Sequence, residues 1–145
     1  MLIKEYPLVR FERGEESDLV FAEFIDIMNV DLKTAIEIVH CRLDFTANKE
    51  HYLVADMSQV REVTSQAKEF MQDPAGGLKN ILAAALIGSN PLSVLWANIF
   101  IKTPKNFPAK FFWNKSDAVQ WINEQRHKNQ NVRLGLTAAN KNQLL

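Results

Sequence analysis

Cysteine, glycine and proline are all scarce in this sequence of 145 residues. The single cysteine, Cys41, cannot form an internal disulfide, which excludes a small secreted scaffold held by disulfides. The five glycines form neither a Gly-x-Gly-x-x-Gly nor a Gly-x-x-x-x-Gly-Lys-Ser/Thr pattern, so neither common phosphate-binding loop is present. The three histidines lie far apart, and none has a second ligand at metal-binding spacing. We therefore expect no metal ion and no other cofactor.

Long apolar runs are also missing. The most apolar stretch, residues 81–101, is interrupted at Gly88-Ser89-Asn90-Pro91 and is not expected to cross a bilayer as one helix. The N-terminus lacks a basic start followed by an apolar segment and a small-residue cleavage site, so no signal peptide is expected. We therefore expect no integral membrane segment and a cytoplasmic location.

Net charge is absent overall, because 17 basic residues balance 17 acidic ones. The halves of the chain nevertheless differ: residues 1–73 hold 15 acidic and 8 basic residues, which leaves 2 and 9 for the rest. Either the fold mixes these charges, or the surface has an acidic and a basic side that suits a polar partner. Nucleic acid is not expected, because no recognition motif accompanies the lysines of residues 102–115.

Apolar periodicity divides the chain into alternating strands and helices. Strands are predicted at residues 6–12, 19–25, 51–56, 81–87 and 109–113. Helices are predicted from Asn29 or Asp31 to about residue 48, from Thr64 to about 71, from Asn90 to about 102, and from Asn114 or Ser116 to Lys128. The order β-β-α-β-α-β-α-β-α predicts an α/β fold with a single mixed, largely parallel β-sheet covered by helices. This domain would span residues 1–128, and the polar residues 129–145 would form a mobile tail.

Candidates for catalysis are few. Asp56 follows a buried strand at its carboxyl end, where ligands bind in open α/β sheets, but an Asp followed by Ser58 also suits a strand cap. His40 and Cys41 are neighbours on a helix and point in different directions, so they cannot form a catalytic pair alone. Because the sequence places no base, nucleophile and orienting residue together, we do not expect an enzyme.

Residues 52–67 resemble the STAS domain of anti-sigma-factor antagonists, in which a strand ends in Asp-x-Ser and a helix then starts with Asp-Ser-Ser-Gly. Asp56-Met57-Ser58 matches the first motif, and Thr64-Ser65-Gln66-Ala67 stands at the second. Farther on, Lys110–Trp113 and Asp117–Ile122 are similar to the SpoIIAA-like branch, in which a Phe-bearing strand precedes a helix with Ala-x-x-Trp. The resemblance covers about residues 6–127 and implies a non-catalytic regulatory module that binds proteins.

The phosphorylated motif of that family is only partly retained, because Val63 and Ala67 replace its acidic residue and its glycine. Thr64 and Ser65 keep hydroxyl groups. Thr64 either only caps the helix or, with Ser65, forms a phosphorylated site at the free amides of the helix start. The resemblance implies that Asp56 and Ser58 lie near the same regulatory loop.

The predicted helix from Pro91 to Lys102 has two apolar stripes. The first contains Leu92, Leu95, Trp96 and Ile99, and the second contains Val94, Ile101 and the nearby Phe100. Such a helix is either deeply buried or meets a partner. We predict that Val94, Phe100 and Ile101 form an apolar contact with a protein partner or a second copy of the chain. The alternative function is a carrier of a small apolar ligand or lipid, which requires an enclosed cavity of about 300 Å³.

Overall fold

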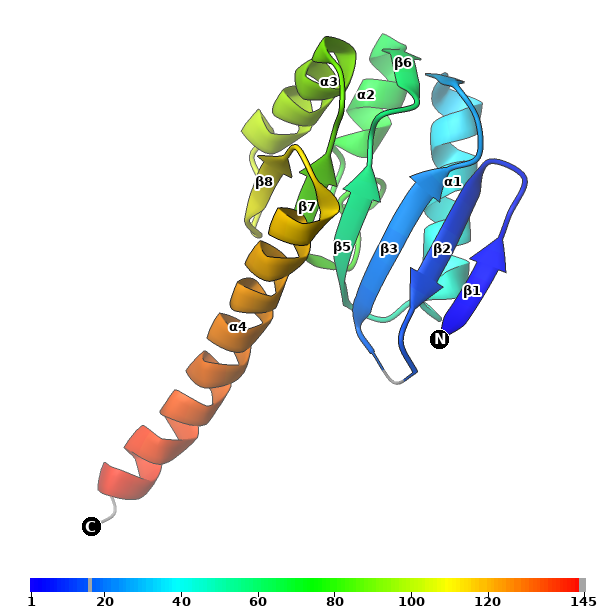
Figure 1. Ribbon diagram of the computed structural model, residues 1–145. Coiled ribbons are helices and arrows are strands. Elements are labelled where there is room, and N and C mark those ends of the chain that lie inside the picture. The colour runs from blue at the N-terminus through cyan, green and yellow to red at the C-terminus, as the bar shows by residue number, and fades with distance from the viewer. Residues whose placement is uncertain (16, 144–145) are drawn as a thin grey trace.

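A six-stranded mixed sheet forms the centre of the computed structural model, which describes the backbone of residues 1–15 and 17–143 and the side chains of residues 1–15 and 17–132 (Figure 1). In spatial order its strands are β1 (Leu2–Glu5), β2 (Val9–Arg13), β3 (Leu19–Phe24), β5 (His51–Asp56), β7 (Ile81–Ile87) and β8 (Ala109–Phe112). The first three are antiparallel, whereas β3, β5, β7 and β8 are parallel. The predicted fold class is confirmed.

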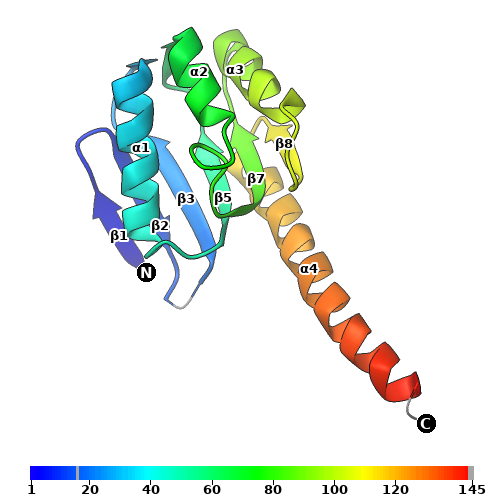
Figure 2. The ribbon, with the colours of Figure 1, turned by 180° about the vertical axis from the view of Figure 1, so that it is seen from behind.

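Three helices cover one face of this sheet, and the fourth covers part of the other (Figures 1 and 2). They are α1 (Leu32–Phe45), α2 (Ser65–Met71), α3 (Pro91–Lys102) and α4 (Lys115–Gln143). Helices α1 to α3 each connect two parallel strands, and right-handed crossovers in one direction place them all on the same face. Only α4, which follows the last strand, lies on the other face, where it contacts β5, β7 and β8. The strands β1 and β2 therefore have no covering helix on that face among the described residues, and β3 is covered only in part, where Leu19 and Phe21 pack with residues of α4.

The predicted caps start the helices as expected. The side chains of Asp31 and Thr64 accept hydrogen bonds from backbone amides at the starts of α1 and α2, and Asn114 does so at the start of α4. Asn90 and Ser93 form a reciprocal capping box at the start of α3, directly before Pro91. The positions of these four helix starts thus follow from local sequence.

Apolar side chains on both faces bury the middle of the sheet. Along β5, Leu53 and Ala55 face α1 and α3, whereas Tyr52 and Val54 face α4. The three alanines of β7, residues 83–85, are fully buried and leave room for helices on both sides. This two-sided burial explains why β5 and β7 read as continuous apolar runs.

Three short strands were not predicted. One is the edge strand β1, and the others are β4 (Met28–Val30) and β6 (Val60–Val63), which pair in parallel as a separate two-stranded sheet. These segments contain three or four residues, so their propensity carries little signal and their pairing depends on distant partners. Met28, Val30 and Val60 form a third apolar cluster with Ala35 and Ala67 of the helices.

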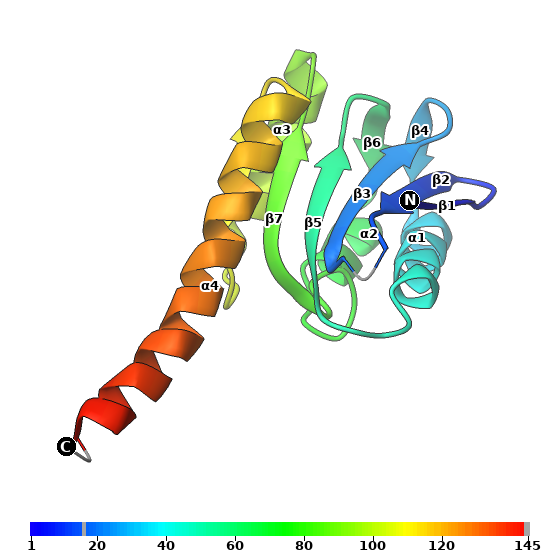
Figure 3. The same cartoon turned by 60° about the horizontal axis from the view of Figure 1, so that its bottom comes forward.

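The prediction that the last helix ends at Lys128 is wrong, because α4 continues to Gln143 and projects beyond the sheet (Figure 3). No proline follows Pro108 to stop the helix. Two contacts also hold its middle against the sheet: Asn129 Nδ2 donates to Tyr52 Oη at 2.6 Å, and Arg126 pairs with Asp18 at 2.8 Å. The mobility of residues 129–145 stays a prediction.

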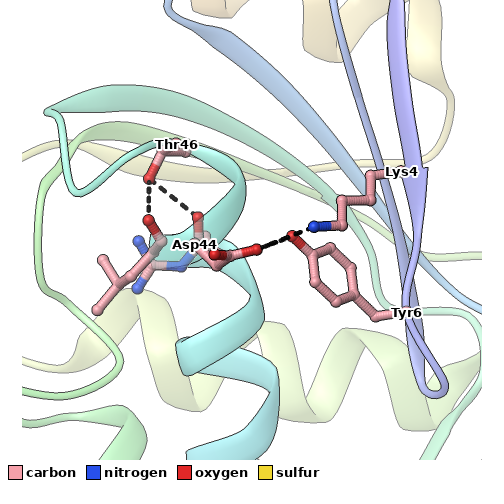
Figure 4. A network of polar contacts seen from close by, with 6 residues as sticks. Lys4, Tyr6, Asp44 and Thr46 are labelled. Atoms are coloured by element: carbon pink, nitrogen blue, oxygen red, sulfur yellow. Dashed lines mark hydrogen bonds and ion pairs between the residues drawn. The ribbon is translucent and has the colours of Figure 1, made fainter.

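Polar contacts join the start of the chain to the end of α1 (Figure 4). Tyr6 Oη donates to Asp44 Oδ2 at 2.6 Å, and Lys4 Nζ approaches the same oxygen at 3.2 Å. These two donors lower the pKa of Asp44, while burial and the hydrogen bond to Asp44 raise the pKa of Tyr6. Thr46 Oγ1 closes the helix end by donating to the carbonyl of Arg42. The network fixes the β1–β2 hairpin against α1.

Candidate functional site

Asp56 and Ser58 lie at the carboxyl end of β5, as predicted. The Ser58 amide donates to Asp56 Oδ1 at 2.9 Å, and the Ser58 carbonyl accepts from Asn90 Nδ2 at 3.1 Å. Asp56 therefore stabilises the turn after its strand, and this turn is joined to the first residue before α3. This arrangement fixes the turn, and its hydrogen bond from the Ser58 amide occupies one oxygen of the Asp56 carboxylate.

Thr64 and Ser65 lie farther along, after β6, at the start of α2. Both side chains are exposed, and Thr64 Oγ1 accepts from the Ala67 amide at 3.2 Å. The strand β6, which pairs with β4, separates Thr64 and Ser65 from Asp56 and Ser58 along the chain. No hydrogen bond joins these two pairs of described residues. The cap role of Thr64 is thus present in the structure, and phosphorylation stays a prediction.

A groove of about 500 Å³ opens beside Asp56 on the α4 face of the sheet, next to the part that this helix leaves uncovered. It carries both signs of charge: Arg10 pairs with Glu23 at 2.8 Å across β2 and β3, and Lys115 Nζ lies 4.5 Å from the centre of the Phe21 ring. At its margin, Trp113 is 64 % exposed and packs edge-on against Phe111. Of its charged lining residues, Lys115 alone comes from the basic second half of the chain.

The apolar stripes of α3 differ in exposure. Leu92 and Leu95 are 44 % and 49 % exposed, and they are the most exposed apolar side chains of this helix. Val94 is half-buried, while Phe100 and Ile101 pack partly against the main core. The outward surface of α3 therefore carries only Leu92 and Leu95 of the first stripe, and the contact predicted for Val94, Phe100 and Ile101 stays a prediction.

A partly open cavity of about 130 Å³ lies between the sheet and helices α1 to α3. Its walls are almost entirely apolar, with aromatic rings from Phe11, Phe24, Trp96 and Phe100. Half of the ten partly exposed residues of its lining lie on α2 and α3, so the cavity approaches the surface beside these helices. This volume is below the roughly 300 Å³ of drug-sized ligand sites but close to the about 150 Å³ that admits benzene.

Arg42 is the buried charge beside this cavity. Its side chain leaves the inner face of α1, and the residue is only 4 % exposed. Its guanidinium donates to the carbonyls of Lys79 and Gly77 at 2.8 and 3.1 Å and contacts His51 Nε2 at 3.0 Å. Burial lowers the pKa of Arg42 to about 10, so the group remains a cation at neutral pH.

His51 is held in one tautomer by its two neighbours. Its Nδ1 lies 2.9 Å from the Lys49 carbonyl, which can only accept, and its Nε2 faces the Arg42 guanidinium, which can only donate. The proton of the neutral ring is therefore on Nδ1. Burial, and then the positive charge of Arg42, lower the pKa of His51 to about 4, although the Lys49 carbonyl acts in the opposite direction.

Other candidates for chemistry are dispersed. Burial raises the pKa of the half-buried Cys41 thiol, which packs against the main core. Within the described part of the chain, no group of three His, Cys, Asp or Glu side chains could hold a metal ion. No helix in that part is long and apolar enough to span a membrane.

Sequence reasoning missed Arg42 as a functional candidate. The buried positions of α1 are Ala35, Ile38, Val39 and Arg42, which share one face at helical spacing. The sequence signal for a buried charge was an arginine placed at the same helical spacing as the apolar residues of α1. Its partners are carbonyls 35 and 37 residues away, so sequence alone did not indicate how the charge would be accommodated.

The fold is that of a SpoIIAA-like α/β domain. A solved structure of an uncharacterised protein from Shewanella loihica PV-4, from the DUF3478 family and with a SpoIIAA-like fold, matches this chain with a TM-score of 0.56. The match covers 79 % of this chain and 91 % of the other at 17 % sequence identity, so it shows the fold alone. The SpoIIAA-like fold that the sequence resemblance implies is thereby confirmed.

The family follows from the sequence itself. A family model described as a domain of unknown function, DUF7793, matches residues 15–126, and the chain belongs to this family. No curated protein matches the sequence.

Proposed function

We propose that this protein is a non-catalytic regulatory module of the STAS type that binds another protein through the carboxyl end of its sheet. The observation that carries this proposal is the position of its exposed apolar side chains. Five of the nine large apolar side chains exposed among the described residues follow the carboxyl ends of parallel strands. They are Ile25, Ile27, Leu92, Leu95 and Trp113.

Parallel strands end at one edge of a sheet, so these side chains belong to one end of the molecule. Exposed apolar side chains that share one end of a domain are typical of protein-binding surfaces, whereas isolated ones need no explanation. Trp113 has the residue type that most often contributes strongly to protein interfaces. The mixed charges of the neighbouring groove would supply the polar rim of such a contact.

Regulation would act at the exposed hydroxyls of Thr64 and Ser65. A phosphate on either residue would add negative charge at the start of α2, which lies at the same end of the domain as the carboxyl end of β5 (Figure 1). Such a charge would change the affinity for the partner without any catalytic step. A cytoplasmic location is part of this proposal.

The test is a charge substitution on α3. A Leu92→Glu/Leu95→Glu variant is compared with Val132→Glu, which changes an exposed apolar residue on α4, far from the proposed surface. Proteins cross-linked to the wild-type chain in its host are identified, purified and titrated by calorimetry against all three proteins. Self-association is measured by sedimentation against the monomer mass of 16.6 kDa.

We expect the double variant to lose at least tenfold in affinity and Val132→Glu to bind like the wild type. Equal affinity of all three proteins would refute the proposed surface. A wild-type chain that sediments as a monomer and binds no cross-linked protein after purification would refute the function itself.

The cavity does not reach the roughly 300 Å³ expected of a carrier of drug-sized ligands, and the second candidate function is therefore narrowed to a carrier of a smaller apolar molecule. The apolar walls of the cavity and its volume of about 130 Å³ suit a ligand of about the size of benzene. Binding of toluene, detected as an increase in melting temperature and as shifts of methyl resonances from residues that line the cavity, would support it. Absence of both effects at saturating toluene would remove it.

A further inference from the structure

The cavity between the sheet and helices α1 to α3 has an unusual balance of charge. Its lining includes two cationic side chains, Arg42 and Lys68, and no aspartate or glutamate. The remaining walls are apolar except for Gln72 and the backbone at Gly77. The surface of the cavity is itself almost entirely apolar, and no acidic side chain in the lining balances the two cations.

Arg42 has more donors than acceptors. A guanidinium group carries five N–H bonds, and the structure provides three acceptors: His51 Nε2 and the carbonyls of Lys79 and Gly77. None of these three is an anion, since His51 is neutral when its Nε2 accepts. Burial alone accounts for the pKa of Arg42, with no contribution from a neighbouring carboxylate.

A buried cation without an anion is unfavourable in a folded protein. Transfer of a charged group into the interior costs several kcal/mol, and arginine is rarely fully buried unless it is paired. Hydrogen bonds from the guanidinium to the turn at residues 77–79 offset part of this cost and hold α1 against that turn. They leave the charge itself uncompensated beside a space that can hold a small molecule.

We propose that this cavity binds a small monocarboxylate with an apolar body, whose carboxylate group pairs with Arg42. The inference rests on the carrier candidate above and names the chemical class of its ligand. A planar carboxylate matches the fork of a guanidinium group, and the two remaining N–H bonds provide donors for it. The apolar walls would enclose a ring or short chain, and the volume of about 130 Å³ limits the body to about six carbon atoms.

Lys68 supports this assignment from the margin of the cavity. It lies on α2, half-buried, and belongs to the side on which the cavity approaches the surface. A positive charge there would attract an anion toward the cavity before the anion reaches Arg42. Gln72, the residue that follows α2, donates to Thr103 at the end of α3 at 2.9 Å and closes the same side. An anion that enters on this side would pass between α2 and α3, close to this hydrogen bond.

The experiment compares benzoate with two neutral molecules of similar shape, benzamide and toluene, by NMR and calorimetry at pH 7.5. The proteins are the wild type, Arg42→Met, which keeps a long apolar stem without charge, and Lys115→Met, which removes a cation from the groove outside the cavity. The side-chain Nε–H resonance of Arg42 reports directly on contact with the carboxylate.

We expect benzoate to bind the wild type and Lys115→Met at least tenfold more tightly than benzamide does and to shift the Arg42 Nε–H resonance. Arg42→Met should lose this preference and still bind toluene. If Arg42→Met does not fold, the comparison of benzoate with benzamide and the Arg42 resonance in the wild type decide the matter. Equal binding of benzoate and benzamide would overturn the inference and leave the carrier candidate intact, whereas no binding of any of the three molecules would overturn both.

Discussion

Lowering the pH from 7.5 to 4 tests the buried contact between His51 and Arg42. In the folded protein, burial and the nearby guanidinium keep His51 neutral and lower its pKa to about 4. In the unfolded chain the same imidazole titrates near its ordinary pKa of about 6.5. Between these two pH values the unfolded state binds a proton that the folded state does not bind.

The sign of the effect follows from this difference. Stability from the neutral His51 is fully present above about pH 6.5 and is lost as the pH falls toward 4, because protonation then favours the unfolded chain. The shift of about 2.5 pH units corresponds to about 3 kcal/mol. Since a small domain is stable by only about 5–15 kcal/mol, the expected loss is a large part of the total.

Urea denaturation at pH 7.5, 6.5, 5.5 and 4.5, followed by circular dichroism, measures this loss. A His51→Gln variant should be less stable than the wild type at pH 7.5, because it loses the aromatic ring packed beside Arg42, but its stability should change little over the same range. A matched His40→Gln variant, which alters an exposed histidine of α1, should retain the full pH dependence. A wild-type free energy of unfolding that stays constant from pH 6.5 to 4.5 would refute the reasoning.

Three further perturbations test the packing of the domain. In urea denaturation, Gly77→Ala should destabilise the domain by about 3 kcal/mol, because the new Cβ would meet the backbone of Met71. Gly14→Ala should have little effect, because the nearest side-chain atom would lie 3.4 Å from its Cβ. In the same assay, Thr64→Ala should lower the free energy of unfolding by about 1 kcal/mol and Thr64→Ser by much less. Equal losses in the two variants would show that the Thr64 hydroxyl does not cap α2. Tyr52→Phe removes the acceptor of Asn129, so amides of α4 beyond residue 129 should exchange with deuterium faster than in the wild type, while those of α3 should not change.

The boundaries of α3 were predictable because its signals are local. Asn90 and Pro91 fix its start, and Pro104 lies just beyond its end, so no distant residue is needed to place the helix. The strands β5 and β7 were predictable for a similar reason, since each is an apolar run bounded by polar or glycine residues. In these elements, local propensity and tertiary burial agree.

Short strands and the orientation of helix faces depend instead on partners far away in sequence. Met28–Val30 becomes a strand because Val60–Val63 pairs with it, and neither segment is long enough to show a period. Both apolar stripes of α3 fit a buried face equally well, so the sequence could not show that Leu92 and Leu95 face outward. The role of Arg42 was hidden in the same way, because its acceptors belong to a turn more than 30 residues away.

Helix α3 links the two proposed binding sites. Its outer side carries Leu92 and Leu95, at the end proposed to bind a protein, while Trp96, Ile99 and Phe100 line the cavity. A ligand that opens the α2–α3 contact must displace one of these helices, and a displacement of α3 would move both sets of side chains together. Linkage then requires that ligand and partner change each other's affinity by the same factor. A partner affinity that is identical with and without saturating benzoate would place the movement in α2 and make the two sites independent.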